Sequence, residues 1–310
     1  MPTDTDRREI TLTSIRDEAR ELAAPPAQGP PVPPSETGYY GLPLLKRPVW
    51  SASVPLYFFV GGAAGAAAII GAAARARGRN RLAHDARWMA AGGALISAAL
   101  LTEDLGRPSR FLNMLRVFKP QSAMSVGSWA LSAFGASATG AALTSSAALD
   151  VAAAATGAVM TTYTGVLIGA TAIPAWSEAV DLLPAHFGAS ALGSATALLE
   201  LLGHRDAALH HLATVAAAAE TVAGASVEMK RSAAVRPLRE GPSGLLVRVG
   251  GLLSGPMPLA LRLLGRRRRM ARRAAGLSAI IGSLVTRFGW VRAGSASADD
   301  PAVPLKLPRA

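Results

Sequence analysis

The 310-residue sequence contains no cysteine. Disulfides, thiolate catalysis and metal clusters with cysteine ligands are therefore excluded from this chain. The sequence also lacks a phosphate-binding glycine loop, a zinc-ligand spacing and a nucleophile elbow, so it shows no recognisable nucleotide-binding or hydrolase site.

Charged residues are scarce as well, at 17% of the chain, whereas a soluble protein carries about a quarter. Half of the residues are hydrophobic, yet aromatic residues make up only 5%. The apolar content comes from Ala, Gly and Leu, and Gly is more frequent in membrane helices than in soluble ones. This composition predicts an integral membrane protein.

The net charge of +12 arises mainly from arginines at the ends of apolar runs. Such clusters occur at residues 75–81 and 266–273. Membrane proteins place Lys and Arg in short loops, where these residues contact anionic lipid headgroups. The positive charge therefore indicates contact with membrane lipid, and nucleic acid is not expected as a partner.

The chain is expected to form three regions. Residues 1–38 are polar and then proline-rich, without the apolar core of a signal peptide, and predict a disordered or partner-bound tail. Residues 39–292 contain the apolar runs and predict the membrane domain, and residues 293–310 predict a C-terminal tail.

We expect the membrane domain to be an all-α bundle of about eight transmembrane helices with both termini on one side, since a span takes roughly 20 residues. Three charge-free runs are long enough, namely residues 53–74, 122–149 and 151–174. Further helices are expected at residues 88–102, 182–199, 207–227, 244–264 and 274–290. Arg248, Arg262 and Arg287 interrupt the last two, which leaves surface helices open as the alternative.

Two pairs of glycines lie one helical turn apart, Gly61 with Gly65 and Gly165 with Gly169. Small residues at this spacing let helix backbones approach closely in a membrane. The alternative is that the richness in Ala and Gly reflects a GC-rich genome.

Three blocks between residues 39 and 129 contain distinctive sequence motifs. They are Tyr39-Tyr40-Gly41-Leu42-Pro43, the stretch from Pro55 to Gly65, and the stretch from Asp104-Leu105-Gly106-Arg107-Pro108-Ser109-Arg110 to Trp129. These blocks, and the apolar runs between them, resemble the NrfD family of polysulfide reductase membrane subunits. The resemblance covers about residues 39–230 and fades in the last two helices.

The resemblance implies a multi-pass subunit of the plasma membrane that is non-catalytic alone and binds menaquinone or another quinone. Its expected partners are a ferredoxin-like iron–sulfur subunit and a molybdopterin oxidoreductase of the formate dehydrogenase or polysulfide reductase type, as in anaerobic respiration. Since this chain has no cysteine, any iron–sulfur centres must belong to a partner subunit. The resemblance implies that the molybdopterin also belongs to a partner subunit.

Five residues are candidates for the quinone site: Trp50, Tyr57, Asp104, Trp129 and Tyr163. Tyr57 and Tyr163 lie in charge-free runs, where a phenol needs a hydrogen-bond partner. Tyr163 resembles the tyrosine of a Tyr-Thr-Gly signature in the family's fourth helix, so we expect it to donate to a quinone carbonyl. The histidine and asparagine of some relatives are missing between residues 47 and 53, so headgroup contacts differ in detail. The alternative is that the aromatic residues only mark the membrane interface.

The loop over residues 103–119 is rich in charge and contains prolines. Arg107, Arg110 and Arg116 in this loop are expected to dock the iron–sulfur partner. The alternative is that Asp104 and these arginines only cap a helix and set the membrane topology.

Glu220 lies within an apolar run, where an ionisable residue costs about 2.5–3.5 kcal/mol to insert and marks a functional site by default. Together with Glu178 and Glu200, it is expected to carry protons. The alternative is that a protonated Glu220 forms a hydrogen bond between helices.

The histidines argue against haem, which takes axial histidines from facing helices at matched depth. We expect His84, His186 and His204 at helix ends, whereas His210 and His211 are neighbours on different faces. Two other functions stay open. A small-solute or ion transporter would be favoured by inverted repeats or matched broken helices, which the sequence does not show, and a purely structural membrane anchor would bind no quinone.

Overall fold

The computed structural model describes residues 45–300, apart from residues 108 and 266–267. The expected tail over residues 1–38, the block Tyr39–Pro43 and residues 301–310 lie outside this part. The described residues form helices and no strand, which confirms the all-α class.

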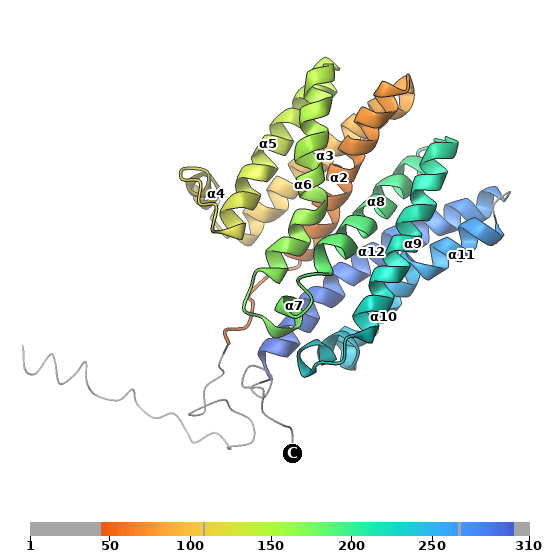
Figure 1. Ribbon diagram of the computed structural model, residues 1–310. Helices are drawn as coiled ribbons and strands as arrows, with labels where there is room; N and C mark the ends of the chain where they lie inside the picture. Colours follow the sequence, from red (N-terminus) through yellow and green to blue (C-terminus); the bar gives the residue numbers. More distant parts are fainter. Residues whose placement is uncertain (1–44, 108, 266–267, 301–310) are drawn as a thin grey trace, which may run out of the picture. The chain divides into compact units, whose positions relative to one another are not determined.

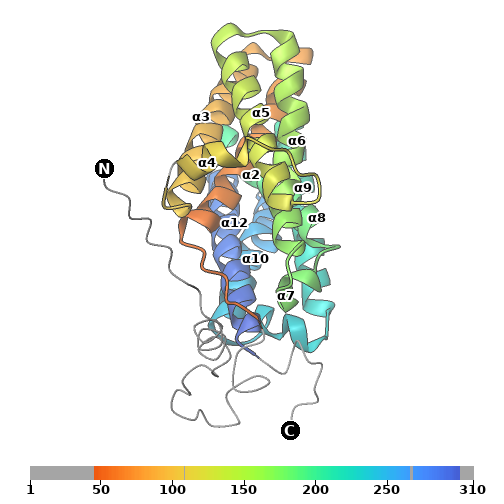
Figure 2. The same ribbon diagram turned by 90° about the vertical axis from the view of Figure 1, so that its left-hand side faces the viewer.

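The first half of the fold contains the long helices α2 (Ser53–Ala76), α3 (Asn80–Asp104), α5 (Ala123–Thr144) and α6 (Ala147–Gly169). Helix α2 packs against α3 and α6, and α5 packs against the same two helices. Figure 2 views this half with α3, α5 and α6 towards the reader. The connection between α3 and α5 contains the short helix α4 (Ser109–Met114).

The second half contains α8 (Leu183–Leu201), α9 (Ala207–Met229), α10 (Gly241–Ser254), α11 (Pro256–Leu264) and α12 (Arg269–Ala298). Helix α12 packs against α8, α10 and α11, while α8 also packs against α2 and α6 of the first half. The short helices α7 (Pro174–Ser177) and η2 (Ala233–Leu238) contact each other and α12 (Figure 1).

Successive long helices run in opposite directions (Figure 1). We call the end with α7, η2 and the start of α2 the α7 end, and the other end the opposite end. The described chain begins and finishes at the α7 end. The two termini themselves lie outside the described part, so their predicted location on one side of the membrane stays a prediction. The turns after α2, α5 and α8 lie at the opposite end, as do the end of α11 and the start of α12 (Figure 1). Arginines therefore gather at this end, at residues 75–81 and 268–273.

Four stretches are long and apolar enough to cross a membrane among the described residues. They are Ser53–Ala76, Ala147–Gly169, the α10–α11 pair over Gly241–Leu264, and Arg269–Ala298. The protein is therefore a helical membrane protein, and the predicted total of about eight spans stays a prediction.

The arginines that interrupt the last two runs each contact a partner from another helix, Arg262 and Arg287 in the interior and Arg248 at the surface. Arg248 pairs with Glu228 at 2.8 Å, and Arg262 pairs with Glu200 at 2.7 Å. The guanidinium of Arg287 lies 3.7 Å from the ring centroid of Phe187. Two of the three charges are thus paired with a carboxylate and the third lies over an aromatic ring. The first run forms α10 and α11, with a break at Gly255, and the second lies within α12.

Close helix packing occurs at the predicted glycines. A Cβ added to Gly65 would lie 2.4 Å from the carbonyl oxygen of Gly157 in α6, and one added to Gly165 would lie 2.5 Å from the carbonyl oxygen of Leu183. Because no side chain fits there, the backbones of α2 and α6 are in direct contact, as small residues in membrane helices permit.

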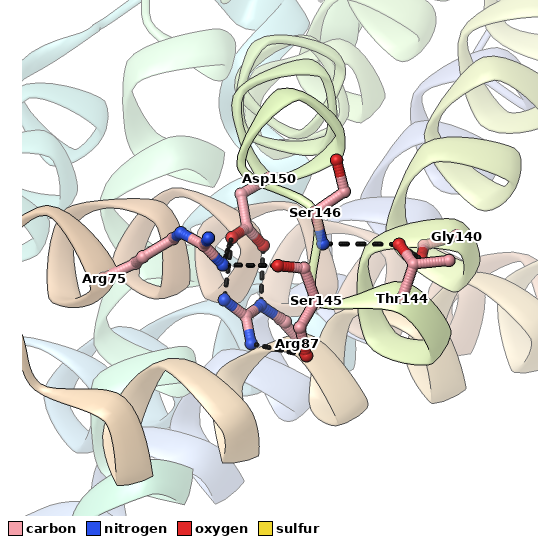
Figure 3. Close-up of polar contacts among 7 residues, drawn as sticks. All are labelled: Arg75, Arg87, Gly140, Thr144, Ser145, Ser146 and Asp150. Carbon is pink, nitrogen blue, oxygen red and sulfur yellow. Dashed lines mark hydrogen bonds and ion pairs between the residues drawn. The ribbon is translucent and has the colours of Figure 1, made fainter.

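An ion cluster joins α2, α3 and α6 at the opposite end (Figure 3). Asp150 accepts two hydrogen bonds from Arg87, at 2.7 and 2.8 Å, and a third from Arg75 at 3.2 Å. Arg75 also donates to the carbonyl oxygen of Ser145 at 2.5 Å. Asp150 is therefore a buried anion that two arginines share.

The same region corrects the predicted helix boundary, which placed Asp150 between two spans. The chain turns earlier, at Ser145, whose φ of 54° ends α5 in the left-handed conformation. Asp150 instead lies in the first turn of α6, where a carboxylate is favoured by the helix dipole.

The last helix corrects the expected start of the C-terminal tail at residue 293, because α12 continues to Ala298. Its final turns are buried against α7. The hydroxyl of Ser297 accepts a hydrogen bond from the backbone N–H of Ala175 at 3.2 Å, and the ring of Trp176 lies where a Cβ on Gly294 would be.

Candidate functional site

A cavity of about 70 Å³ lies between α2, α3, α5 and α6, near the α7 end. It brings together four of the five predicted quinone-site residues, Trp50, Tyr57, Asp104 and Tyr163. The remaining lining residues are Val54, Phe58, Leu101, Leu105, Met114, Met124, Gly127, Ser128 and Leu167. The cavity therefore combines an apolar lining with two phenols and one carboxylate.

Tyr163 is held in place by its own hydrogen bond. Its hydroxyl donates to the carbonyl oxygen of Ala123 at the start of α5. The ring occupies the space next to Gly127, where an added Cβ would lie 2.0 Å from the phenol oxygen. The proton of Tyr163 is thus engaged, unlike in the expected role as donor to a quinone, although the oxygen can still accept.

Tyr57 is the second phenol of this cavity, and its side chain is only 2% exposed. Its hydroxyl forms no hydrogen bond with another described residue. Aromatic contacts fix the ring, whose centroid lies 5.8 Å from that of Phe58. A buried phenol needs a partner, so Tyr57 is the phenol with a donor available for a ligand.

Asp104 lies at the rim, at the end of α3. Its Oδ1 accepts hydrogen bonds from the backbone N–H of Ser51 at 3.0 Å and from the hydroxyl of Ser51 at 2.7 Å. The neighbouring Glu103 accepts from the hydroxyl of Ser53. These bonds tie the start of α2 to the end of α3 and place one carboxylate between the cavity and the surface.

Trp50 closes another part of the rim through aromatic contacts. Its ring stacks on Trp176 with centroids 4.9 Å apart and an angle of 10° between the planes, and it meets Phe58 edge-on at 6.0 Å. The indole N–H of Trp176 donates to the backbone oxygen of Trp290 at 2.8 Å. The rim is therefore supported from α7 and α12.

Trp129 does not line the cavity. Its side chain is 41% exposed and packs edge-on against Phe118, with centroids 6.1 Å apart. This position fits the alternative role of an interfacial aromatic residue.

The predicted docking arginines belong to the connection between α3 and α5. Arg107 and Arg116 are exposed and form no ion pair with any described residue, while the side chain of Arg110 lies outside the described part. This connection borders the cavity through Leu105 and Met114. A partner that binds the two free arginines would therefore lie next to the cavity.

The three predicted proton carriers lie apart from one another. Glu178 is exposed after α7, and Glu200 is bound to Arg262 towards the opposite end. Glu220 is 2% exposed in α9, where its Oε1 accepts from the hydroxyl of Ser254 at 2.9 Å. None of the three contacts another among the described residues, so a path between them would need intervening groups.

His186 is a polar neighbour of Glu220 that the sequence did not reveal. It lies at a helix end, as expected, but it is only 2% exposed, and its Nδ1 lies 3.5 Å from Oε2 of Glu220. The covering elements come from distant parts of the chain. No local pattern around residue 186 could have indicated this burial.

A family model described as polysulfide reductase, of the NrfD type, matches residues 36–299. The match extends through α12, well beyond the expected limit near residue 230. A comparison with curated proteins found no match.

Proposed function

Because the chain belongs to the NrfD polysulfide reductase family, we propose that this membrane subunit binds a quinone in the cavity lined by Tyr57 and Tyr163. Electrons pass between the quinone and an iron–sulfur subunit docked at the α7 end. The membrane subunit supplies the binding site, and the redox centres belong to its partners, since the chain has no cysteine.

The observation that carries this proposal is the unpartnered hydroxyl of Tyr57 inside a largely apolar cavity. A quinone carbonyl accepts hydrogen bonds and its ring needs an apolar slot, and both are present. The volume of about 70 Å³ is below the range of about 300–1,000 Å³ usual for ligand sites. Binding therefore requires side chains to move, and the flexible Met114 and Met124 in the wall suit such a change.

Each of the four residues has a separate role in this proposal. The hydroxyl of Tyr57 donates a hydrogen bond to one quinone carbonyl. Tyr163, fixed by the carbonyl oxygen of Ala123, forms the wall against which the ring lies. Asp104 connects the cavity to the surface and passes protons between the quinone and water, while Trp50 covers the rim.

The test compares Tyr57→Phe with Tyr163→Phe in the intact complex. A net hydrogen bond contributes about 0.5–1.5 kcal/mol, which corresponds to a roughly 2- to 13-fold change at 1.4 kcal/mol per tenfold. Tyr57→Phe should raise the quinone KM or lower the rate by this factor. Reduction of a soluble dye by the partner subunits should stay normal in both variants.

The outcome for Tyr163→Phe separates the two phenols. Tyr163→Phe removes the hydrogen bond to the carbonyl oxygen of Ala123 and should lower the free energy of unfolding by about 0.5–1.5 kcal/mol. Its effect on quinone kinetics should be smaller than that of Tyr57→Phe. Unchanged quinone kinetics in Tyr57→Phe, or a larger effect of Tyr163→Phe, would contradict the assignment of Tyr57 as the donor.

We place the partners at the surface next to this cavity. The exposed Arg107 and Arg116 provide positive charge for a ferredoxin-like iron–sulfur subunit, which in turn serves a molybdopterin enzyme of the formate dehydrogenase or polysulfide reductase type. The ligand we propose is menaquinone or another quinone.

The transporter alternative receives less support. The chain breaks between α10 and α11 at Gly255, but the long helices of the first half contain no corresponding break within the described residues. Matched broken helices are the usual sign of a transporter. The structural-anchor alternative leaves the donor of Tyr57 without a role.

A further inference from the structure

A second and larger cavity, of about 460 Å³, lies between α8, α9, α10 and α12. Its volume falls within the range of about 300–1,000 Å³ usual for small-molecule sites. Its inner wall contains His186, Glu220 and Trp290, each at most 2% exposed. The first cavity shares none of these residues.

The inner wall contains three polar atoms without a hydrogen-bond partner among the described residues. They are Nε1 of Trp290, and Nδ1 of His186 and Oε2 of Glu220, which lie 3.5 Å from each other. Buried polar groups are normally paired, and each exception needs an explanation. Here an indole N–H, which only donates, lies on the same wall as a carboxyl and an imidazole that can accept or donate according to their protonation.

The outer part of this cavity is apolar and lies between α9 and α10, where it is lined by Ala225, Val247 and Leu252. The outward-facing side chains nearby are also apolar, with Val222 66% and Leu245 64% exposed. In a membrane protein such a surface faces lipid. The outer part of the cavity is therefore surrounded by an apolar surface of this kind.

The opening of this cavity is bordered by an ion pair and contains open space next to two glycines. Glu228 and Arg248 form a two-fold hydrogen-bonded ion pair across α9 and α10, at 2.8 and 3.0 Å. Gly224 and Gly251 line the cavity, and a Cβ added to either would meet no atom within 4 Å. The absence of side chains at these two glycines therefore keeps the opening clear.

We propose that this cavity is a second ligand site, which takes a neutral amphiphile with an oxygen-bearing head and an apolar tail. The head accepts a hydrogen bond from the indole N–H of Trp290 and exchanges one with Glu220 or His186. The tail leaves between α9 and α10 into the bilayer. An isoprenoid quinone, or its quinol, and a protonated fatty acid share this chemistry, and the site stands independently of the function proposed for the first cavity.

The test uses the whole complex in lipid nanodiscs and two photoreactive probes. One is an azido-naphthoquinone with an isoprenoid tail, and the other is palmitic acid with a diazirine in its chain. Residues 220–228 of α9 and 247–252 of α10 should be labelled saturably, with competition by excess unlabelled probe. The probe that labels them identifies the ligand as a quinone or as a fatty acid.

Variants then locate the labelling within the cavity. Gly251→Leu fills open space and should reduce labelling at least tenfold, whereas Gly92→Leu in α3, also at a glycine with no atom within 4 Å of an added Cβ, should not. Glu220→Gln keeps the shape and should weaken competition several-fold. Tyr57→Phe should leave this labelling unchanged, which separates the second site from the first.

The proposal is overturned if neither probe labels these residues saturably in the unmodified protein. It is equally overturned if Gly251→Leu folds, as judged by its melting temperature, and still takes up the full label.

Discussion

The ion cluster around Asp150 allows a sharp test of how the bundle is held together. Asp150→Asn preserves the shape of the side chain but removes the negative charge between Arg87 and Arg75. Arg87 donates to Asp150 at 2.7 and 2.8 Å, and the side chains of Arg87 and Asp150 are only 10% and 3% exposed. The variant therefore leaves a buried guanidinium without its counter-ion.

The expected magnitude follows from this burial. Removing one partner of a buried ion pair costs about 3–5 kcal/mol, which is a shift of roughly two to four powers of ten in the folding equilibrium. Asp206→Asn is the matched control. Asp206 pairs with Arg79 at 3.2 Å, but Arg79 is 64% exposed, so losing that pair should cost about 0–1 kcal/mol. Asn also replaces Asp well at the N-cap of α9.

The assay is unfolding by SDS in mixed micelles, followed by circular dichroism. A double variant, Asp150→Leu with Arg87→Met, removes both buried charges and should recover most of the lost stability. Arg75, whose side chain is 37% exposed, can then turn to water. Equal unfolding midpoints for Asp150→Asn and Asp206→Asn would refute the view that burial gives this cluster its strength.

Two further predictions concern the first cavity and its surroundings. Gly127→Ala places a Cβ 2.0 Å from the Tyr163 oxygen and should displace this ring, so that quinone turnover falls strongly, whereas Gly135→Ala, with its nearest atom at 3.9 Å, should be tolerated. Activity of Gly127→Ala equal to that of the unmodified complex would show that the wall is not rigid. Arg107→Glu and Arg116→Glu should each weaken co-purification of the iron–sulfur subunit, whereas Arg77→Glu, also exposed but at the opposite end, should not. Full retention of the subunit in both variants would remove the docking role of this loop.

The sequence predicted the helices wherever a run was both apolar and uninterrupted. Residues 53–74 became α2 almost without change, because no charge falls inside the run and its one proline, Pro55, lies in the first turn, where a helix tolerates proline. The turn at Ser145 was missed because the run stays free of charge there. Serine is common in turns, but the left-handed conformation at this residue is visible only in the structure. The prediction for α11 was weaker because a hydropathy value treats Arg262 as an unpaired charge. In the structure Arg262 pairs with Glu200, which is 62 residues away in the sequence.

The sequence predicted which residues line the cavity better than it predicted how their polar groups are paired. Tyr57, Tyr163, Trp50 and Asp104 do line one cavity, but which phenol has a free donor depends on Ala123, 40 residues before Tyr163. His186 was missed for the same reason, since its burial comes from helices that are remote in sequence. Contacts over such separations leave no local pattern.

The stacking of Trp50 on Trp176 has a consequence for biosynthesis. Trp176 is bound to the backbone oxygen of Trp290 and lies against Gly294, both in the last helix of the described chain. Trp50, at the rim of the first cavity, lies near the start of the chain. The surface on which it stacks is fully fixed only after α12 has been synthesised and has packed against α7. A nascent chain that has inserted α2 to α6 has every other side chain of this cavity, but Trp50 still lacks the surface on which it rests.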